Sequence, residues 1–532
     1  MDASTNALLI DGDAPLTLPD FARIRTDDFR PAIERGMQVH RDELAALVAQ
    51  TAEPDFANTV AAFDRCGHLL GRVLAVFHNL AASATSPALQ AVQRALAGPL
   101  AAHFSAVYQD AGLFQRIDHV HQARHGLGLT PEQLRLVERT HRDFTRQGAQ
   151  LAPDARAEFA AIQAQLAELN TLFAQNLLHD ENAFTLPLPD AASMDGLPEF
   201  VRAAARQAAA ERGLAQPVVT LGRSLVLSFL GFSRRRDLRE QVWRAWVGRG
   251  AHPGAQDNRP VAQQILALRQ RQAVLMGGTS YADVKLTDTM AGTPDRVWAL
   301  LDDVWQRALP ALDAERALLR AAMAAAGASH PLEAWDWRYW AEQVRQARFA
   351  LDDAELKPYF PLPAMVTAAF ECAERLFGLR FTARTDLAGY HPDVAVYQVD
   401  SDDGTPVGLF LQDNFARPAK RSGAWMSVLA QQHRNSADGQ PQLPVVLNNN
   451  NFARGEPGTP TLLSPDDVRT LFHEFGHGLH GLLSNVGYRR MSGTQVLRDF
   501  VELPSQLFEH WGQERAVLLR HARHWQTGAP IP

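Results

Sequence analysis

The sequence predicts a mainly α-helical fold with a small β-sheet near its carboxyl end, because the spacing of apolar residues changes twice. Alanine-rich stretches with apolar residues three or four positions apart fill most of the 532 residues, and this spacing is typical of amphipathic helices. Between about residues 380 and 447, apolar and polar residues alternate instead, as they do in β-strands. Helical spacing then returns around a short motif of histidine and glutamate at residues 473–477.

Three helix starts are marked by a capping hydroxyl followed by proline. Ser86, Thr130 and Thr293 each precede a proline, and a Ser or Thr cap with proline at the first helical position is a strong start signal. A further long helix is expected from about residue 154 to residue 177. We therefore expect successive helices in the first half of the chain and again after residue 293.

One interruption of the helical pattern gives the predicted division of the chain. A short β-like run, Gln216–Leu221, follows a helix that is expected to close near Gly213. We therefore predict two regions. Residues 1–215 form an amino-terminal helical region, and residues 216–532 contain the sheet and the motif of histidine and glutamate.

The expected sheet is built from four alternating segments. Val394–Val399 and Val407–Leu411 flank Asp402-Asp403-Gly404, and a turn of this composition between two such runs predicts a hairpin. Gly423–Leu429 and Leu443–Leu447 follow as further strands. The sheet thus comes directly before the motif in the sequence.

Composition and charge exclude several classes of protein. The net charge of −7 gives no reason to expect nucleic-acid binding. No apolar run of about 18 residues, which a membrane span requires, occurs in the sequence, and the amino terminus does not resemble a signal peptide. Cys66 and Cys372 lie far apart without a metal-ligand spacing, so they are expected to be free thiols in a reducing compartment. We expect a cytoplasmic protein.

The motif at His473, Glu474 and His477 has the pattern H-E-x-x-H. On an α-helix, residues four positions apart lie on one face. Two imidazoles placed in this way bind one zinc ion, and the glutamate between them reaches the metal-bound water as a general base. The motif therefore predicts a zinc-dependent hydrolase.

The residues around the motif support a helix. Ser464 is a suitable N-cap, and Pro465 occupies the first helical position. Three glycines, Gly476, Gly478 and Gly481, lower the intrinsic stability of this helix, since each costs about 1 kcal/mol relative to alanine in a helix interior. They predict that a metal centre or another backbone packs very close to the helix.

The third protein ligand of such a zinc ion is expected on a second segment. His480 is a poor candidate, because seven residues of helix separate it from His473 by about 10 Å. The acidic residues downstream are Asp499, Glu502 and Glu509. The residues alone leave the choice among these three acids open.

Three other histidines, His119, His121 and His125, include a pair with the spacing of four. No acidic residue lies between the members of that pair. We expect these histidines to form a solvated surface.

The segments Phe472–Leu482, Ser492–Thr494 and Arg498–Trp511 resemble the thimet oligopeptidase family of zinc peptidases. Within that family, Arg417–Met426 and Tyr390–Val394 resemble the bacterial peptidyl-dipeptidase branch most. The resemblance implies a two-lobed, neurolysin-like helical fold with a zincin core, in which a deep cleft excludes folded proteins.

The resemblance also implies the roles of individual residues. It makes His473, His477 and Glu502 the ligands of one Zn²⁺ per chain and Glu474 the catalytic base. Asp499 and Glu509 are then expected to contact the ligands rather than the metal. Family members continue beyond the residue that corresponds to Pro532, so the chain is expected to be incomplete at its carboxyl end.

The substrate is expected to bind beside the motif as an added strand. In peptidases of this kind, an edge strand pairs with the peptide main chain, and Gly423 and Ala424, followed by Trp425, are the expected binding residues. A terminal carboxylate needs a cation, and the candidates close to this strand are Lys420, Arg421 and Arg454.

These observations predict a zinc peptidase that releases dipeptides from the carboxyl end of short peptides, with no nucleic-acid or membrane partner. The complete family form is expected to be a monomer. Two alternatives remain. One is an endo-acting oligopeptidase, similar to oligopeptidase A, which would not require a free carboxylate. The other is a truncated chain that binds zinc and peptides with little or no turnover.

Overall fold

The computed structural model describes residues 6–10, 16–349, 353–456 and 458–532, and most of them are helical. The amino-terminal helices are α1 (Thr26–Val48), α2 (Ala62–Arg65), α3 (His68–Ser83), α4 (Pro87–Tyr108), α5 (Ala111–Ala123), α6 (Pro131–Arg146) and α7 (Pro153–Ala183). The middle helices are α8 (Glu199–Ala210), α9 (Arg223–Phe232), α10 (Arg236–Val247), α11 (Asn258–Leu275), α12 (Tyr281–Leu286), α13 (Pro294–Ala325), α14 (Ala334–Phe349), α15 (Asp353–Leu356) and α16 (Leu362–Phe377). The last three are α17 (Pro465–Leu482), α18 (Glu502–Glu509) and α19 (Arg515–His521).

The predicted helix starts are confirmed by their caps. The hydroxyl of Ser86 accepts the backbone N–H of Leu89, and Thr293 caps α13 in the same way. Thr130 and Gln133 form a reciprocal capping box at the start of α6. The long helix expected near residues 154–177 is α7. Local capping chemistry therefore sets these boundaries.

The sheet has five strands, β3 (Leu379–Ala383), β4 (Ala395–Ser401), β5 (Pro406–Phe415), β6 (Trp425–Ala430) and β7 (Val445–Phe452). The four predicted segments correspond to β4, β5, β6 and β7, whereas β3 was not predicted. They lie in the order β3-β4-β5-β7-β6, with β5 and β7 parallel and the other neighbours antiparallel. The hairpin predicted around residues 402–404 joins β4 to β5. Strand β6 lies at one edge of the sheet.

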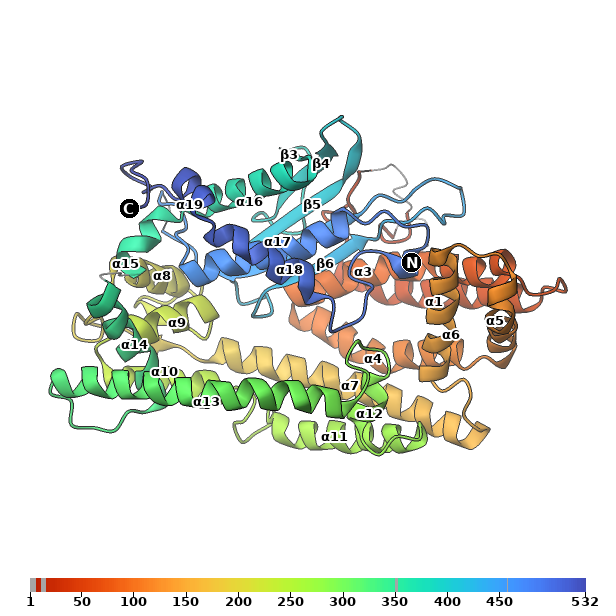
Figure 1. The fold of residues 1–532 in the computed structure, drawn as a ribbon, viewed down its shortest axis with the longest axis horizontal. Coiled ribbons are helices and arrows are strands. Elements are labelled where there is room, and N and C mark those ends of the chain that lie inside the picture. The colour runs from red at the N-terminus through yellow and green to blue at the C-terminus, as the bar shows by residue number, and fades with distance from the viewer. Residues whose placement is uncertain (1–5, 11–15, 350–352, 457) are drawn as a thin grey trace.

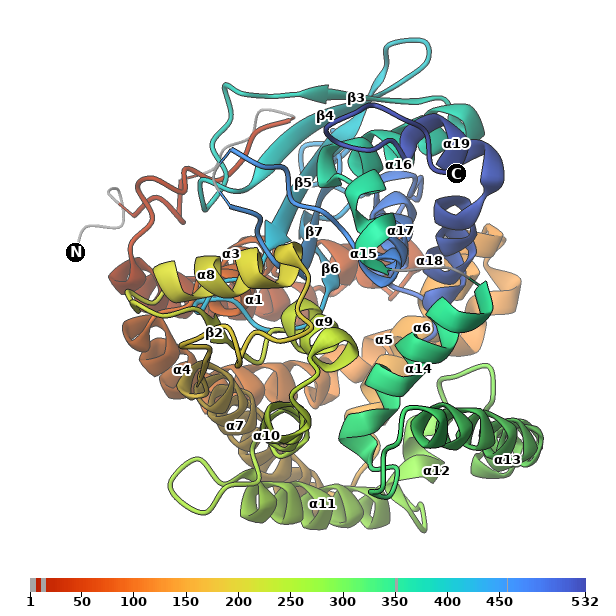
Figure 2. The same cartoon turned by 90° about the vertical axis from the view of Figure 1, so that its left-hand side faces the viewer.

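Both faces of the sheet are buried, and successive residues of a strand pack into two different hydrophobic clusters, one on each face. Phe410 and Val446 pack in a cluster with α16 and α17. Their neighbours Leu409, Leu411 and Val445 pack on the opposite face with α1 and α3. Figure 2 shows the sheet between these two groups of helices. The sheet thus links the amino-terminal helices to the helix that carries the motif.

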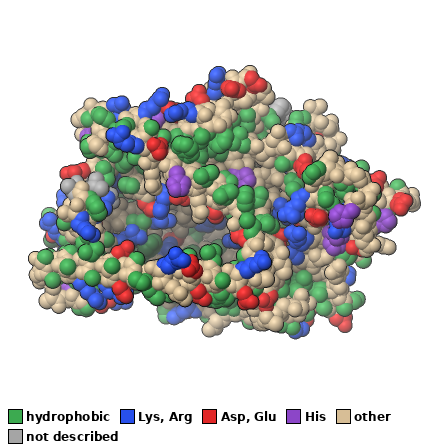
Figure 3. Space-filling model, in the orientation of Figure 1, with side chains coloured by type: hydrophobic (Ala, Val, Ile, Leu, Met, Phe, Trp, Pro, Cys, Tyr) green, Lys and Arg blue, Asp and Glu red, His purple; other side chains and the backbone are tan. Residues whose placement is uncertain are grey.

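The long helices lie on the opposite side of the molecule from the sheet. Figure 1 shows α7, α11 and α13 lengthwise along the lower side, with the sheet and α17 above them. Figure 3 shows the same face hollowed between these two sides, with histidine side chains at the upper border of the hollow. Helix α17, which carries the motif, therefore borders an open hollow, as a two-lobed fold predicts.

Residues 487–495, which lead from α17 toward α18, are bound to the amino-terminal helices. The Asp64 carboxylate accepts the backbone N–H groups of Arg489 and Arg490 at 3.1 and 2.9 Å. Glu132 accepts the N–H of Gly487 at 2.7 Å, and Asp143 pairs with the Arg490 guanidinium at 2.8 Å. Three acidic side chains from the first 150 residues therefore fix this loop.

The division predicted at residue 216 stays a prediction. A two-stranded ladder, β1 (Leu186–Pro187) with β2 (Val218–Val219), joins segments on both sides of it. Within the described residues, none of the helices is both long and apolar enough to cross a membrane.

Candidate metal centre and peptidase site

Helix α17 begins where the sequence predicts. The Ser464 hydroxyl accepts the N–H of Asp467, and the Asp467 carboxylate accepts the N–H of Ser464, with Pro465 at the first helical position. Asp467 also accepts a hydrogen bond from Ser224 of α9 at 2.7 Å. This closed cap fixes the rotation of α17, and therefore the direction in which its motif faces.

The glycines of α17 are explained by close contacts with neighbouring elements. A Cβ atom at Gly476 would lie 2.7 Å from the Cα of Ser505 and 2.9 Å from the Cβ of Phe508, both in α18. At Gly481 it would lie 2.7 Å from Met426 of β6. The prediction that another backbone packs against α17 is confirmed. Only glycine lets α18 approach this closely.

This close approach brings three ligand atoms together. Within the described residues, His473, His477 and Glu502 form a group whose ligand atoms all lie within 4.8 Å of one another. The Oε2 atom of Glu502 is 3.2 Å from Nε2 of His473 and 3.1 Å from Nε2 of His477. The two rings are almost perpendicular, at 84°. The Nε2 atoms therefore converge on one point from two directions.

Further contacts hold two of the three side chains, His473 and Glu502. His473 Nδ1 lies 2.6 Å from the carboxylate of Glu509, at the end of α18. The Ser505 hydroxyl donates to Glu502 Oε2 at 2.9 Å. Glu502 begins α18 and Ser505 lies three residues later, so both face the same side of the helix. The sequence analysis missed Ser505, although its spacing from Glu502 was a usable signal.

Glu474 lies buried beside this group. Its side chain is 5% exposed, and its Oε2 atom is buried without a hydrogen-bond partner among the described residues. Its backbone carbonyl accepts a hydrogen bond from Asn448 of β7 at 2.8 Å. Asn448 is a second residue that sequence reasoning missed, and it ties the motif to the sheet.

Burial sets the protonation of these groups. Burial, followed by the negative charge of the Glu502 carboxylate, raises the pKa of Glu474 to about 8. Burial lowers the pKa of His477. For Glu502, burial alone would raise the pKa, but the Ser505 hydroxyl and the two imidazoles outweigh it and lower the pKa. At neutral pH the group therefore contains an anionic Glu502 and a neutral His477.

This donor set fits a zinc ion. Two imidazoles and one carboxylate are a common ligand set for catalytic zinc, which leaves one coordination position open. His473 is also held by a carboxylate through its other ring nitrogen, as metal-binding histidines usually are. The unpartnered Oε2 atom of Glu474 lies where a water or substrate group would satisfy it.

Asp499 lies outside this arrangement. Its carboxylate accepts the backbone N–H groups of Met290 and Ala291, each at 2.9 Å, in the loop between α12 and α13. The sequence analysis expects Asp499 to contact the metal ligands. Its observed contacts instead connect the segment before α18 with the loop between α12 and α13, on the other side of the hollow. Of the two acids expected to contact the ligands, only Glu509 is placed to do so.

The residues expected to bind substrate lie at the start of the edge strand. Gly423 has a φ of +87° and open space around its Cα. Trp425 begins β6, and the Arg421 guanidinium lies over its ring at 4.3 Å. The sequence predicts Gly423 and Ala424 inside this strand, whereas they come directly before it, because β6 begins at Trp425. Their contact with substrate stays a prediction.

The three candidate cations have different surroundings. The Lys420 side chain is fully buried, 2.9 Å from Asp413 and bonded to backbone carbonyls. It is therefore unable to receive a substrate carboxylate, and this expectation is wrong. Arg454 pairs with Asp393. Arg421, stacked on Trp425, remains the candidate beside the edge strand. Periodicity could not show that Lys420 turns inward.

The chain is similar throughout its length to known peptidases. The model of Peptidase family M3 matches residues 229–532. A dipeptidyl carboxypeptidase of Salmonella typhimurium is 38% identical, and the alignment covers 99% of this chain and 78% of that protein. The dipeptidyl carboxypeptidase of Escherichia coli is 37% identical, with 99% and 77% covered. Oligopeptidase A of Escherichia coli is 34% identical, with 99% and 78% covered.

Proposed function

This chain belongs to peptidase family M3, and we propose that it is a zinc-dependent peptidase that removes dipeptides from the free carboxyl end of short, unstructured peptides. Family membership makes it a metallopeptidase. The observation that supports the proposed centre most directly is the convergence of His473, His477 and Glu502 beside the buried Glu474. The similarity to two dipeptidyl carboxypeptidases supports the release of dipeptides.

In this proposal, His473, His477 and Glu502 hold one zinc ion. When bound, the ion supplies Lewis acidity to the scissile carbonyl and to the attacking water. Glu474 takes the proton from that water and passes it to the leaving amine. Burial keeps the pKa of Glu474 high, which suits a carboxyl group that must both accept and return a proton near neutral pH. Glu509 orients His473 through its Nδ1 atom.

We place the substrate main chain along β6. The strand is an edge of the sheet, so its outer N–H and C=O groups are available to pair with an extended peptide. The open space around Gly423 leaves room for a second backbone. Arg421, beside Trp425, is the cation that we assign to the terminal carboxylate.

The test compares two peptides of one sequence, one with a free carboxyl terminus and one with a terminal amide. The proposal predicts successive loss of dipeptides from the free acid and at least a tenfold lower kcat/KM for the amide, because a charged pair would be lost. Mass spectrometry of the products identifies the bond cleaved. Cleavage of the amide at an undiminished rate and at internal bonds would instead support the oligopeptidase A-like alternative, to which the 34% identity with oligopeptidase A of Escherichia coli also points.

A Glu474→Gln variant is the control for the chemistry. It should keep its metal and lose about 10²–10⁴ in kcat, which is the usual contribution of a general base. Wild-type turnover by this variant would remove Glu474 from its role. Zinc binding without turnover in the wild-type chain would support the binding-only alternative.

We also infer that the protein acts as a monomer in the cytoplasm. Cys66 and Cys372 are both free, and free cysteines are usual in a reducing compartment. Cell fractionation and the elution volume of the purified chain test the two statements. An extracytoplasmic pool or a dimeric elution volume would contradict them.

A further inference from the structure

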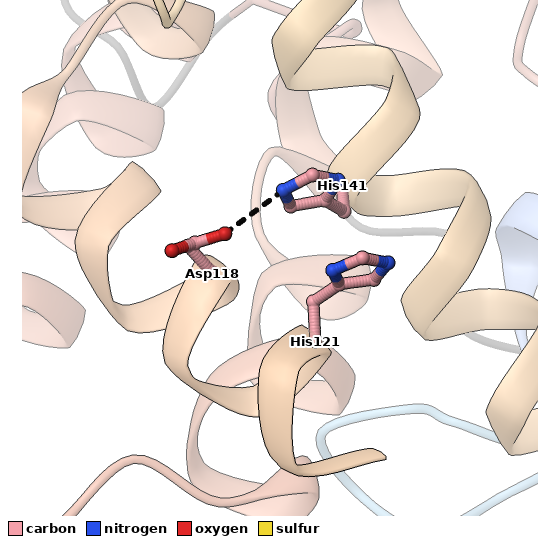
Figure 4. A group of neighbouring side chains, drawn as sticks. All are labelled: Asp118, His121 and His141. Carbon is pink, nitrogen blue, oxygen red and sulfur yellow. Dashed lines mark hydrogen bonds and ion pairs between the residues drawn. The ribbon is translucent and has the colours of Figure 1, made fainter. Parts of the chain in front are cut away.

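A second group of potential metal ligands lies far from the peptidase site, between α5 and α6. Asp118 and His121 are three residues apart on α5, and His141 is on α6. Within the described residues, this is one of two groups whose ligand atoms all lie within 4.8 Å of one another, and the other is the proposed zinc centre. Figure 4 shows the three side chains pointing into the space between the two helices.

The three side chains of this group are in close contact with one another. His141 Nε2 lies 3.0 Å from Asp118 Oδ1. The rings of His121 and His141 are stacked, with centroids 3.8 Å apart and planes within 6° of parallel. Among the three histidines expected to form a solvated surface, His119 and His125 are exposed, whereas His121 turns toward His141 and is half-buried.

The charges around the group leave its ligand atoms available to a cation. Arg124 and Arg142 line the same pocket, but each has partners of its own. Arg142 pairs with Asp288 at 2.7 Å, and Arg124 donates to the carbonyl of His121 at 2.6 Å. Both arginines are therefore bound to carboxylate or carbonyl oxygens.

We propose that Asp118, His121 and His141 form a second binding site for a divalent ion of the zinc type, outside the peptidase centre. Two imidazoles and a carboxylate suit zinc and its neighbours rather than calcium or magnesium, which prefer oxygen ligands alone. The ion would take the place of the hydrogen bond between His141 and Asp118. The two rings would have to turn out of their parallel stack, because the lone pairs of stacked rings run side by side and do not converge.

An ion at this site would join α5 to α6 next to the loop that precedes α18. Helix α6 also carries Asp143, which pairs with Arg490, and Arg139, which donates to the carbonyl of Gln495. Because a ligand that binds only the folded state stabilises it, zinc should raise the melting temperature through this site. This effect does not depend on catalysis.

The test counts zinc ions in the full chain after loading and desalting. The wild type should hold two equivalents and His121→Ala one. His119→Ala is the matched control, because it removes an exposed histidine from the same helix, and it should keep both equivalents. Glu502→Ala should keep the ion between α5 and α6 and lose the other, which separates this proposal from the proposed peptidase centre.

The second measurement is the melting temperature of Glu502→Ala with and without zinc. Zinc should raise it, and the rise should vanish in Glu502→Ala/His121→Ala. Two results would overturn the proposal. One is an equal zinc content in the wild type and His121→Ala. The other is an equal loss from His119→Ala, which would indicate binding by scattered surface histidines.

Discussion

The Nδ1 atom of His473 and the Oε1 atom of Glu509 are 2.6 Å apart, and this contact joins the last residue of α18 to the helix that carries the motif. The first residue of α18, Glu502, contacts the Nε2 atom of the same imidazole at 3.2 Å. One short helix therefore contacts both nitrogens of His473, so its placement fixes the ring.

Removing the Glu509 carboxylate should loosen that ring. Glu509→Ala is expected to weaken zinc binding by about 10–100-fold, the usual effect of losing a residue that orients a ligand. Glu509→Gln keeps a hydrogen-bond acceptor and should weaken it less. Competition with a chromogenic chelator measures both. The exposed Glu514 provides the control substitution Glu514→Ala, and equal affinities in all four proteins would contradict an orienting role.

Gly476→Ala should disturb the approach of α18 to α17. The added methyl would lie 2.7 Å from the Cα of Ser505, which is backbone and unable to move alone. Overpacking of this kind costs about 1–3 kcal/mol. Because Glu502 lies on the displaced helix, zinc affinity should fall together with the free energy of unfolding. Urea denaturation and metal titration measure the two effects.

The control for this substitution is Gly231→Ala, in α9, where a Cβ atom would have nothing within 4 Å. Alanine is the better helix former, so that variant should be as stable as the wild type or slightly more so. A Gly476→Ala protein with wild-type stability and zinc affinity would show that α18 adjusts to the methyl group without displacing Glu502.

Asp499→Ala should leave the metal in place and free the loop between α12 and α13. Its carboxylate accepts the N–H groups of Met290 and Ala291, so hydrogen exchange at those two amides should accelerate. Asp499→Asn, which keeps one acceptor oxygen, should fall between the wild type and alanine. A stoichiometric loss of zinc from Asp499→Ala would mean instead that Asp499 acts at the metal centre.

The buried pair of His40 and His103 should make the protein sensitive to acid. Their ring nitrogens, Nδ1 and Nε2, lie 3.1 Å apart. Burial, followed by the neighbouring charges of His103 and Arg489, lowers the pKa of His40 to about 4. The unfolded chain has an ordinary histidine pKa near 6.5. Between these two values, the unfolded state binds more protons than the folded state.

The free energy of unfolding should therefore fall as the pH drops from about 6.5 to about 4, and His40 contributes about 3 kcal/mol to that fall at most. His40→Gln should be less stable at pH 7, because it loses the hydrogen bond between the two rings. Its free energy of unfolding should also depend less on pH. Urea denaturation at several pH values measures both slopes. His125→Gln removes an exposed histidine and should keep the wild-type slope, and parallel curves for His40→Gln would refute the assignment.

The parts of the site that depend on neighbouring residues could be predicted from the sequence. Ser464 and Pro465 fix the start of α17 through local hydrogen bonds, and Gly476 indicated a close backbone. Both signals act within a few residues of the position that they determine. Four of the five strands of the sheet could be predicted for the same reason, because alternation is a local property, whereas β3 was not predicted.

Other parts depend on the path of the chain and were not predictable in this way. Asp499, Glu502 and Glu509 all carry a carboxylate. Only the packing of α18 on α17 brings Glu502 to the Nε2 atom of His473 and Glu509 to its Nδ1 atom, while Asp499 contacts neither. The parallel pairing of β5 with β7 and the inward turn of Lys420 are likewise set by distant residues. His121 meets His141 because α5 packs on α6, which no spacing within one helix could show.

The attachment of residues 487–495 to the amino-terminal helices has a consequence for how the protein is made. The Asp64 carboxylate binds the backbone N–H of Arg490, which lies 426 positions later in the chain and is therefore synthesised much later. At ribosomal speeds of about 5–20 residues per second, that interval is roughly 20–85 s. During this time, the helices before residue 150 can fold, but three of their acidic groups lack the backbone amides and the arginine that they bind in the finished protein. The proposed metal centre needs Glu502, so it is absent until the residues that follow this loop have been made.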